Sequence, residues 1–176
     1  MTRLVFALFA SFALGACSSV QREPPRQIPL TKAAVLPLAL TDDFSFRKVS
    51  TFFYDTRDAS FQQPTANPML QFQRQRAGFG AVSGYDRMER FGHYFNVWWR
   101  SKDTAPVTVR LEYRQQNLGS HVQARELFYA EPKGTVLTKF TVIGDEYLDD
   151  GRITAWRLLL IQNNRIVGLR QSFLWN

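Results

Sequence analysis

One stretch of strictly alternating residues constrains the fold of this chain more than any other feature. Apolar and polar side chains alternate in the order Val107, Thr108, Val109, Arg110, Leu111, Glu112, Tyr113 and Arg114. Successive side chains of a β-strand point to opposite faces of a sheet, whereas an amphipathic helix repeats its apolar residues every three or four positions. The pattern therefore predicts a β-strand with one buried face and one polar face.

Turn-forming residues divide the rest of the C-terminal half into segments of strand length. We expect strands at about 90–101, 121–131, 135–144, 152–162 and 165–175, a further one over 47–54 and a weaker one over 70–76. The turns between them include Pro132-Lys133-Gly134, Asp149-Asp150-Gly151 and Asn163-Asn164, and the asparagine pair suits the positive φ angles of a tight hairpin. No segment shows a helical period. These features predict an all-β fold, an antiparallel β-sandwich or alternatively an antiparallel β-barrel. Immunoglobulin-like and fibronectin-like sandwiches resemble the chain in strand count only.

The N-terminal residues have the pattern of a cleaved secretion signal. Arg3 is followed by an apolar stretch over 4–14, which is too short for the roughly 20 residues of a transmembrane helix. The next residues, Leu14-Gly15-Ala16-Cys17, resemble the lipobox of bacterial lipoproteins, and Cys17 is the only cysteine of the chain. The resemblance implies that the Cys17 sulfur receives a diacylglycerol, that cleavage follows Ala16 and that the new amine is acylated.

These signals divide the chain into three parts. We expect a lipoprotein signal peptide over 1–16, a lipidated, proline-containing tether over 17–43 and a single β-sandwich domain over 44–176. The apolar run over 33–40 could dock on the domain as an edge strand, which proline tolerates. Because two or three acyl chains hold a protein durably on a bilayer, the lipid bilayer is the first expected partner. Ser18 favours the outer membrane, by analogy with Gram-negative lipoproteins. The domain then faces the periplasm or, as the open alternative, the cell surface.

Residues suited to catalysis or metal binding are sparse. His93 and His121 are the two histidines, and His93 falls on the apolar side of its strand, so we expect a satisfied core histidine and no zinc site. The densest acidic cluster contains Asp145, Glu146, Asp149 and Asp150. It could hold calcium or supply the carboxylate pair of a glycosidase, but its sequence favours a solvated loop. We therefore expect no enzyme, no metal and no cofactor.

Two adjacent tryptophans identify a candidate ligand or interface face. Trp98 and Trp99 follow each other in a predicted strand, so their side chains point to opposite faces of the sheet. Trp99 belongs with the apolar side of the strand, which leaves Trp98 on the other side with Tyr94, Asn96 and Arg100. A strip of this composition is typical of a sugar-stacking platform, of a protein interface or of a second packed layer.

Three functions follow from these features. The leading hypothesis is a membrane-anchored envelope lipoprotein whose non-catalytic sandwich binds another envelope protein or supports envelope assembly. The alternative is a glycan-binding module for peptidoglycan or polysaccharide that uses the aromatic strip, and a hydrolase ranks third. The net charge of +7 would also suit an anionic partner, although the basic residues are scattered along the chain. Delivery to the periplasm argues against nucleic acid.

The lipobox makes a direct prediction about the mature protein. Mass spectrometry of the protein from its native host should show an N-terminal Cys17 carrying acyl chains. Cys17→Ser should abolish both the acylation and the cleavage, because the sulfur is the lipid acceptor. An unmodified sulfur or a retained leader on the unaltered chain would contradict the prediction.

Overall fold

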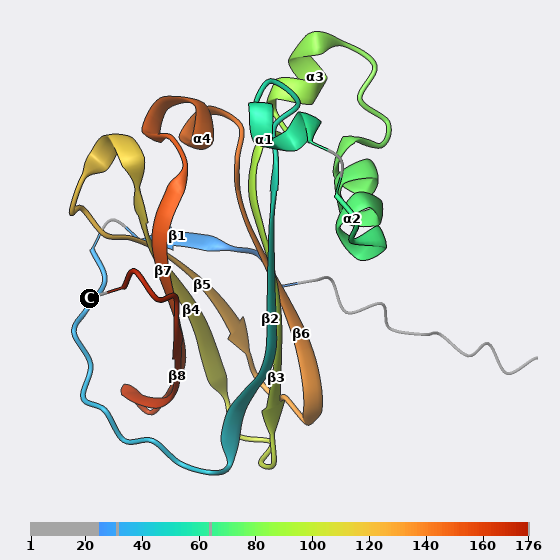
Figure 1. Ribbon diagram of the computed structural model, residues 1–176. Helices are drawn as coiled ribbons and strands as arrows, with labels where there is room; N and C mark the ends of the chain where they lie inside the picture. The colour runs from blue at the N-terminus through green and yellow to red at the C-terminus, as the bar shows by residue number, and fades with distance from the viewer. Residues whose placement is uncertain (1–24, 31, 64, 176) are drawn as a thin grey trace, which may run out of the picture.

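Two antiparallel sheets pack face to face, which confirms the expected all-β sandwich (Figure 1). The structure, a computed structural model, describes residues 25–30, 32–63 and 65–175. One sheet has the strand order β1-β5-β4-β7-β8 and the other the order β2-β3-β6. The strands are β1 (Ile28–Leu30), β2 (Phe44–Tyr54), β3 (Gly92–Ser101), β4 (Val107–Gln115), β5 (Gln123–Tyr129), β6 (Gly134–Ile143), β7 (Ile153–Gln162) and β8 (Arg165–Gln171).

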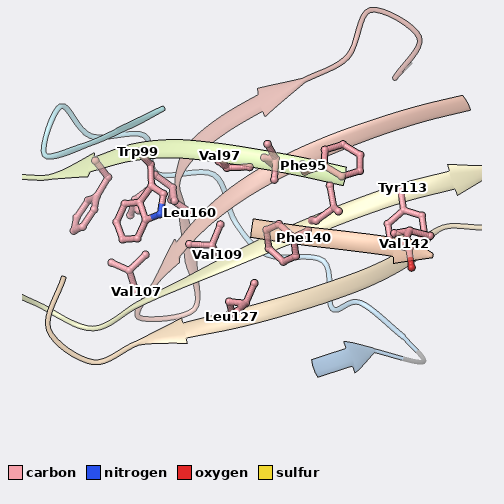
Figure 2. Packing of buried hydrophobic residues seen from close by; sticks show 14 residues of the cluster. Phe95, Val97, Trp99, Val107, Val109, Tyr113, Leu127, Phe140, Val142 and Leu160 are labelled. Atoms are coloured by element: carbon pink, nitrogen blue, oxygen red, sulfur yellow. The ribbon is translucent and has the colours of Figure 1, made fainter. Parts of the chain in front are cut away.

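The core lies between the sheets, where the alternation of each strand places its apolar side chains. Figure 2 shows residues of β3 and β6 facing residues of β4, β5 and β7. Trp99 is fully buried there, and its indole Nε1 donates a hydrogen bond of 2.8 Å to Thr138 Oγ1. The hydroxyl of Tyr129 lies 2.8 Å from the same oxygen. The polar atoms of this part of the core are therefore paired with one another, as burial requires.

The strands expected around the C-terminal half are confirmed with small shifts of their ends. Asn163 and Asn164 have φ angles of 49° and 57°, as the hairpin between β7 and β8 requires. The last strand ends earlier than expected, at Gln171, and a turn brings Trp175 back over the sheet. The guanidinium carbons of Arg114 and Arg157 lie 4.8 and 4.9 Å from the centre of the Trp175 ring.

The expectation of a strand over 70–76 is wrong, because these residues belong to a helix. The helices are α1 (Ala59–Gln62), α2 (Pro68–Gly78), α3 (Gly84–Met88) and α4 (Asp145–Asp150). Asn67 caps α2 by accepting hydrogen bonds from the backbone of Met69 and Leu70, and Pro68 occupies the first turn. This cap and proline pair is a helix start signal that the sequence analysis missed. None of the helices in the described ranges is long and apolar enough to cross a membrane.

The segment before β2 is more ordered than a free tether. Ile28–Leu30, expected within the tether, form strand β1 and pair antiparallel with β5. The run over 33–40 forms no regular strand of its own. Only Leu38 bridges to Ile166 at the edge of β8, and Ala39 N donates to Ile166 O over 2.8 Å. Residues 1–24, which carry the expected signal peptide and Cys17, lie outside the described residues.

A second, smaller core cluster has Tyr54, Phe91 and Tyr147 as its buried residues and includes residues of all four helices. At its centre the buried carboxylate of Asp55 accepts hydrogen bonds of 2.9–3.0 Å from Arg57 and of 3.0 Å from the hydroxyl of Tyr147 in α4. Burial opposes the ionisation of Asp55, but the hydrogen bonds from Arg57 and Tyr147 outweigh it and hold the pKa below 3.8. The carboxylate therefore links the end of β2 to α4 as a charged group.

His93 is a satisfied, partly buried histidine, as expected. Its Nε2 accepts a hydrogen bond of 3.1 Å from the backbone of Ile153, and its ring lies 5.1 Å from that of Phe53. Burial, together with the positive charge of Arg152, lowers the pKa of His93 from 6.5 to about 4. The folded protein therefore keeps this imidazole neutral at pH values where the unfolded chain protonates it.

This difference predicts how stability changes with pH. Between pH 6.5 and pH 4 the unfolded chain binds a proton that the folded protein excludes, so the free energy of unfolding falls as the pH falls. The total fall in the free energy of unfolding is on the order of 3 kcal/mol, because each unit of pKa shift corresponds to about 1.4 kcal/mol. Urea denaturation at a series of pH values should show this slope, and His93→Gln should flatten it. An identical slope in the His93 variant would contradict the assignment.

Candidate functional site

A groove of about 640 Å³ lies on the outer face of the three-stranded sheet. Side chains that pair across antiparallel strands point to the same face. Three such cross-strand rows form the floor of the groove: Phe52–Tyr94–Thr141, Ser50–Asn96–Lys139 and Lys48–Trp98–Leu137. The groove has the volume of a small-molecule site, which typically measures roughly 300–1,000 Å³.

Helix α2 forms one wall of the groove, and its C-terminal end lies close against the sheet. A Cβ on Gly78 would lie 2.3 Å from the hydroxyl of Tyr54, so a side chain at this position would force Tyr54 or the helix to move. Arg90 donates hydrogen bonds to the carbonyl oxygens of Ala77 and Phe79 at the same end of the helix. The N-terminal half of α2 instead presents Met69 and Phe72 to the groove. None of the helix residues is fully buried.

Three apolar side chains of the groove are largely exposed. Met69 is 62% exposed, Phe72 58% and Leu137 42%, although all three line a concave site. Exposed apolar side chains gathered in one place, rather than scattered singly, mark an interaction site. The groove therefore offers apolar surface that a ligand would remove from water.

The charges of the groove are of one sign. Lys48, Arg76, Arg90 and Lys139 line it, and within the described ranges no lining residue is acidic. Lys48 Nζ lies 5.3 Å from the centre of the Trp98 ring and so stays over the floor. Arg90 is held by its hydrogen bonds to backbone carbonyls, which leaves the other three cations to meet a ligand. The groove therefore suits a negatively charged group close to apolar surface.

The aromatic part of the floor is preformed. The rings of Phe52 and Tyr94 stack at 4.7 Å with only 7° between their planes. The Tyr94 hydroxyl donates a hydrogen bond of 2.7 Å to the carbonyl oxygen of Arg90. Burial raises the pKa of Tyr94 to about 12, so this hydroxyl remains a neutral donor at physiological pH.

Three of the four residues of the expected strip lie in the groove. The middle position of each row of the floor is a residue of β3, namely Tyr94, Asn96 or Trp98. Trp99 is buried on the opposite face of the sheet. Arg100 is exposed further along β3 and does not line the groove. The contributions of the flanking strands and of the wall formed by α2 were not predicted from the sequence.

The acidic cluster does not form the expected solvated loop. Its residues lie in or beside helix α4, which packs on the sandwich through the buried Tyr147. Glu146 accepts hydrogen bonds from Tyr113 and Arg125, and Asp150 accepts one of 3.0 Å from Gln123. In the part of the chain that the structure describes, no three His, Cys, Asp or Glu residues come together as a metal site. Glu146 and Asp150 thus fix α4 to β4 and β5, whereas Asp145 and Asp149 are exposed to solvent as expected.

The two adjacent tryptophans allow a matched test of these assignments. Trp99→Ala should lower the free energy of unfolding by about 3–5 kcal/mol, because it empties a fully buried site. Trp98→Ala should lower it by only about 1 kcal/mol, because the Trp98 side chain remains partly in water. Urea denaturation of both variants measures the two losses. Equal losses would place Trp98 in the core and contradict its role in the groove.

Comparisons with known proteins assign no family to the chain. No family model, no curated protein and no solved structure matches it. The chemistry of the groove and the pattern of the N-terminal residues are therefore the two sources from which a function can be inferred.

Proposed function

We propose that this protein is a lipid-anchored envelope protein that binds an anionic amphiphile in the groove between α2 and the outer face of the three-stranded sheet. The observation that carries the proposal is the combination of exposed apolar side chains with basic residues and no acidic ones. The apolar part of the ligand would cover Met69, Phe72 and Leu137. Its charged group would meet Lys48, Arg76 or Lys139. Binding of this kind requires no reaction.

An amphiphile fits the groove better than a glycan does. Sugar rings bind on flat aromatic surfaces that are surrounded by hydrogen-bonding groups, and Trp98 with Asn96 and Ser50 offers such a surface on part of the floor. Apart from its basic residues, the rest of the groove is mostly apolar, with Met69 and Phe72 on the wall and Phe52 and Leu137 on the floor. An alkyl chain gains free energy over the whole of this surface, by about 25 cal/mol for each Å² buried.

The position of the N-terminal segment supports a ligand that comes from the membrane. The Gln27 side chain donates to Lys139 O and accepts from Thr141 N, both over 3.4 Å, at the edge of the groove. Cys17 lies ten residues earlier in the sequence, so even a fully extended chain spans at most about 35 Å between them. Acylation of Cys17 would therefore keep the groove close to a bilayer.

Ligands that share one tail but differ in head group would test this function. We expect the chain over 17–176 carrying Cys17→Ser to bind dodecyl phosphate and to bind dodecyl maltoside much more weakly, as measured by isothermal titration calorimetry below their micellar concentrations. The double change Lys48→Gln and Lys139→Gln should weaken dodecyl phosphate binding up to about tenfold, because two partly exposed charge contacts contribute about 1.4 kcal/mol together.

The controls separate the groove from general charge and from the glycan alternative. Lys133→Gln removes one exposed charge in the β5–β6 turn and should leave the affinity unchanged. Trp98→Ala should weaken dodecyl phosphate binding, because it removes part of the apolar floor. Equal affinity for the two detergents would contradict the proposal. Binding of soluble peptidoglycan fragments that is lost in Trp98→Ala would instead identify a glycan-binding module.

A further inference from the structure

We propose that one exposed segment docks on the surface of an anionic bilayer. This segment, called the tip, covers residues 79–85, which form the loop between α2 and α3 and the first residues of α3. This docking goes beyond the ligand in the groove, because the tip lies outside the floor formed by the sheet. Three large apolar residues are exposed within these seven positions: Phe79 at 83%, Val82 at 87% and Tyr85 at 64%. The partner is a lipid surface, for the reasons given below.

Local packing does not account for the exposed tip. Ser83 and Asp86 form a capping box at the start of α3. The residue before such a cap commonly packs on an apolar residue five positions later, but here Val82 is followed at that position by Arg87. Val82 therefore has no partner within its own helix. Tyr85, in the first turn of α3, also points its ring into solvent.

The tip nevertheless has a defined shape. The Asp86 carboxylate accepts hydrogen bonds of 3.1 and 2.9 Å from the backbone of Val82 and Ser83. The Arg90 guanidinium donates to the carbonyl oxygen of Phe79 on the other side of the loop. The backbone N–H groups of Val82 and Ser83 and the carbonyl oxygen of Phe79 are thus bonded within the protein, while the apolar side chains are exposed. An element that dips into the interfacial region of a bilayer needs this arrangement.

The charges beside the tip select the partner. Arg76 precedes it on α2, and Arg87 and Arg90 follow it. The two acidic residues nearby are Asp86, whose carboxylate is occupied by the capping box, and Glu89. Aromatic and aliphatic residues flanked by arginines are the composition of segments that bind anionic membrane surfaces. A neutral protein interface would not need the arginines.

Docking at the tip would also orient the groove. The tip continues directly from α2, and Arg76 and Arg90 line the groove as well as flank the tip. The end of the groove next to the tip would therefore lie at the lipid surface, where an amphiphile could pass between the bilayer and the protein. This arrangement rests on the proposed function, whereas docking of the tip does not.

A position-specific probe on the full chain would test the docking. In the full chain carrying Cys17→Ser, a single cysteine is introduced as Val82→Cys or, as the matched control, Val35→Cys, and labelled with the fluorophore NBD. Val35 is 99% exposed and lies on the segment that runs to the β8 edge, away from α2 and α3 (Figure 1). Both variants are reconstituted into phosphatidylcholine vesicles with and without phosphatidylglycerol.

We expect the label at residue 82, and not that at residue 35, to shift its emission to shorter wavelength and to be quenched by nitroxide-bearing lipids. The shift should require phosphatidylglycerol, fall at high salt and shrink when Arg76→Gln and Arg87→Gln are added. Equal signals at the two positions, or no dependence on phosphatidylglycerol, would overturn the proposal. A shift that follows protein density rather than lipid composition would overturn it in favour of pairing between copies of the chain. Because dodecyl phosphate binding is measured separately, either proposal can fail without the other.

Discussion

The pleat of β3 connects the stability of this protein to its candidate site. β3 is the central strand of the three-stranded sheet, and it places Phe95, Val97 and Trp99 in the core. Their burial fixes the register, because a slip of one residue would turn every buried side chain outward. The same register sets Tyr94, Asn96 and Trp98 on the outer face. The floor of the groove is therefore as rigid as the core behind it.

The wall of the groove obeys a different constraint. Helix α2 contacts the sheet where Gly78 meets Tyr54, and its other end carries the largely exposed apolar side chains of Met69 and Phe72. A helix with an apolar stripe on the core would have closed over the sheet and filled the groove. Fixing the helix at one end leaves that surface available for a ligand, at the cost of exposing Met69 and Phe72 to water.

The sequence reveals the parts of this structure that depend on local periodicity. The alternation over 107–114 and the Asn163-Asn164 turn lead directly to strands and a hairpin, and the Trp98–Trp99 pair gives the two faces of β3. Helix α2 was missed because its apolar residues line an open groove and so lack the buried stripe that marks a helix in a sequence. The acidic residues of α4 led to the wrong expectation of a solvated loop for a related reason. Their partners Tyr113, Gln123 and Arg125 lie on strands that are distant in sequence, and no local pattern reports such contacts.

The side chain of Gln27 joins strands of both sheets. Its amide oxygen accepts from Arg125 of β5 as well as from Thr141 N of β6, and its amide nitrogen donates to β6. In an anchored protein, any pull along the N-terminal segment reaches this side chain before it reaches the core. Mechanical load would thus be borne first by a few hydrogen bonds at the mouth of the groove. Tension between envelope and domain would change the shape of that mouth before it unfolded the sandwich.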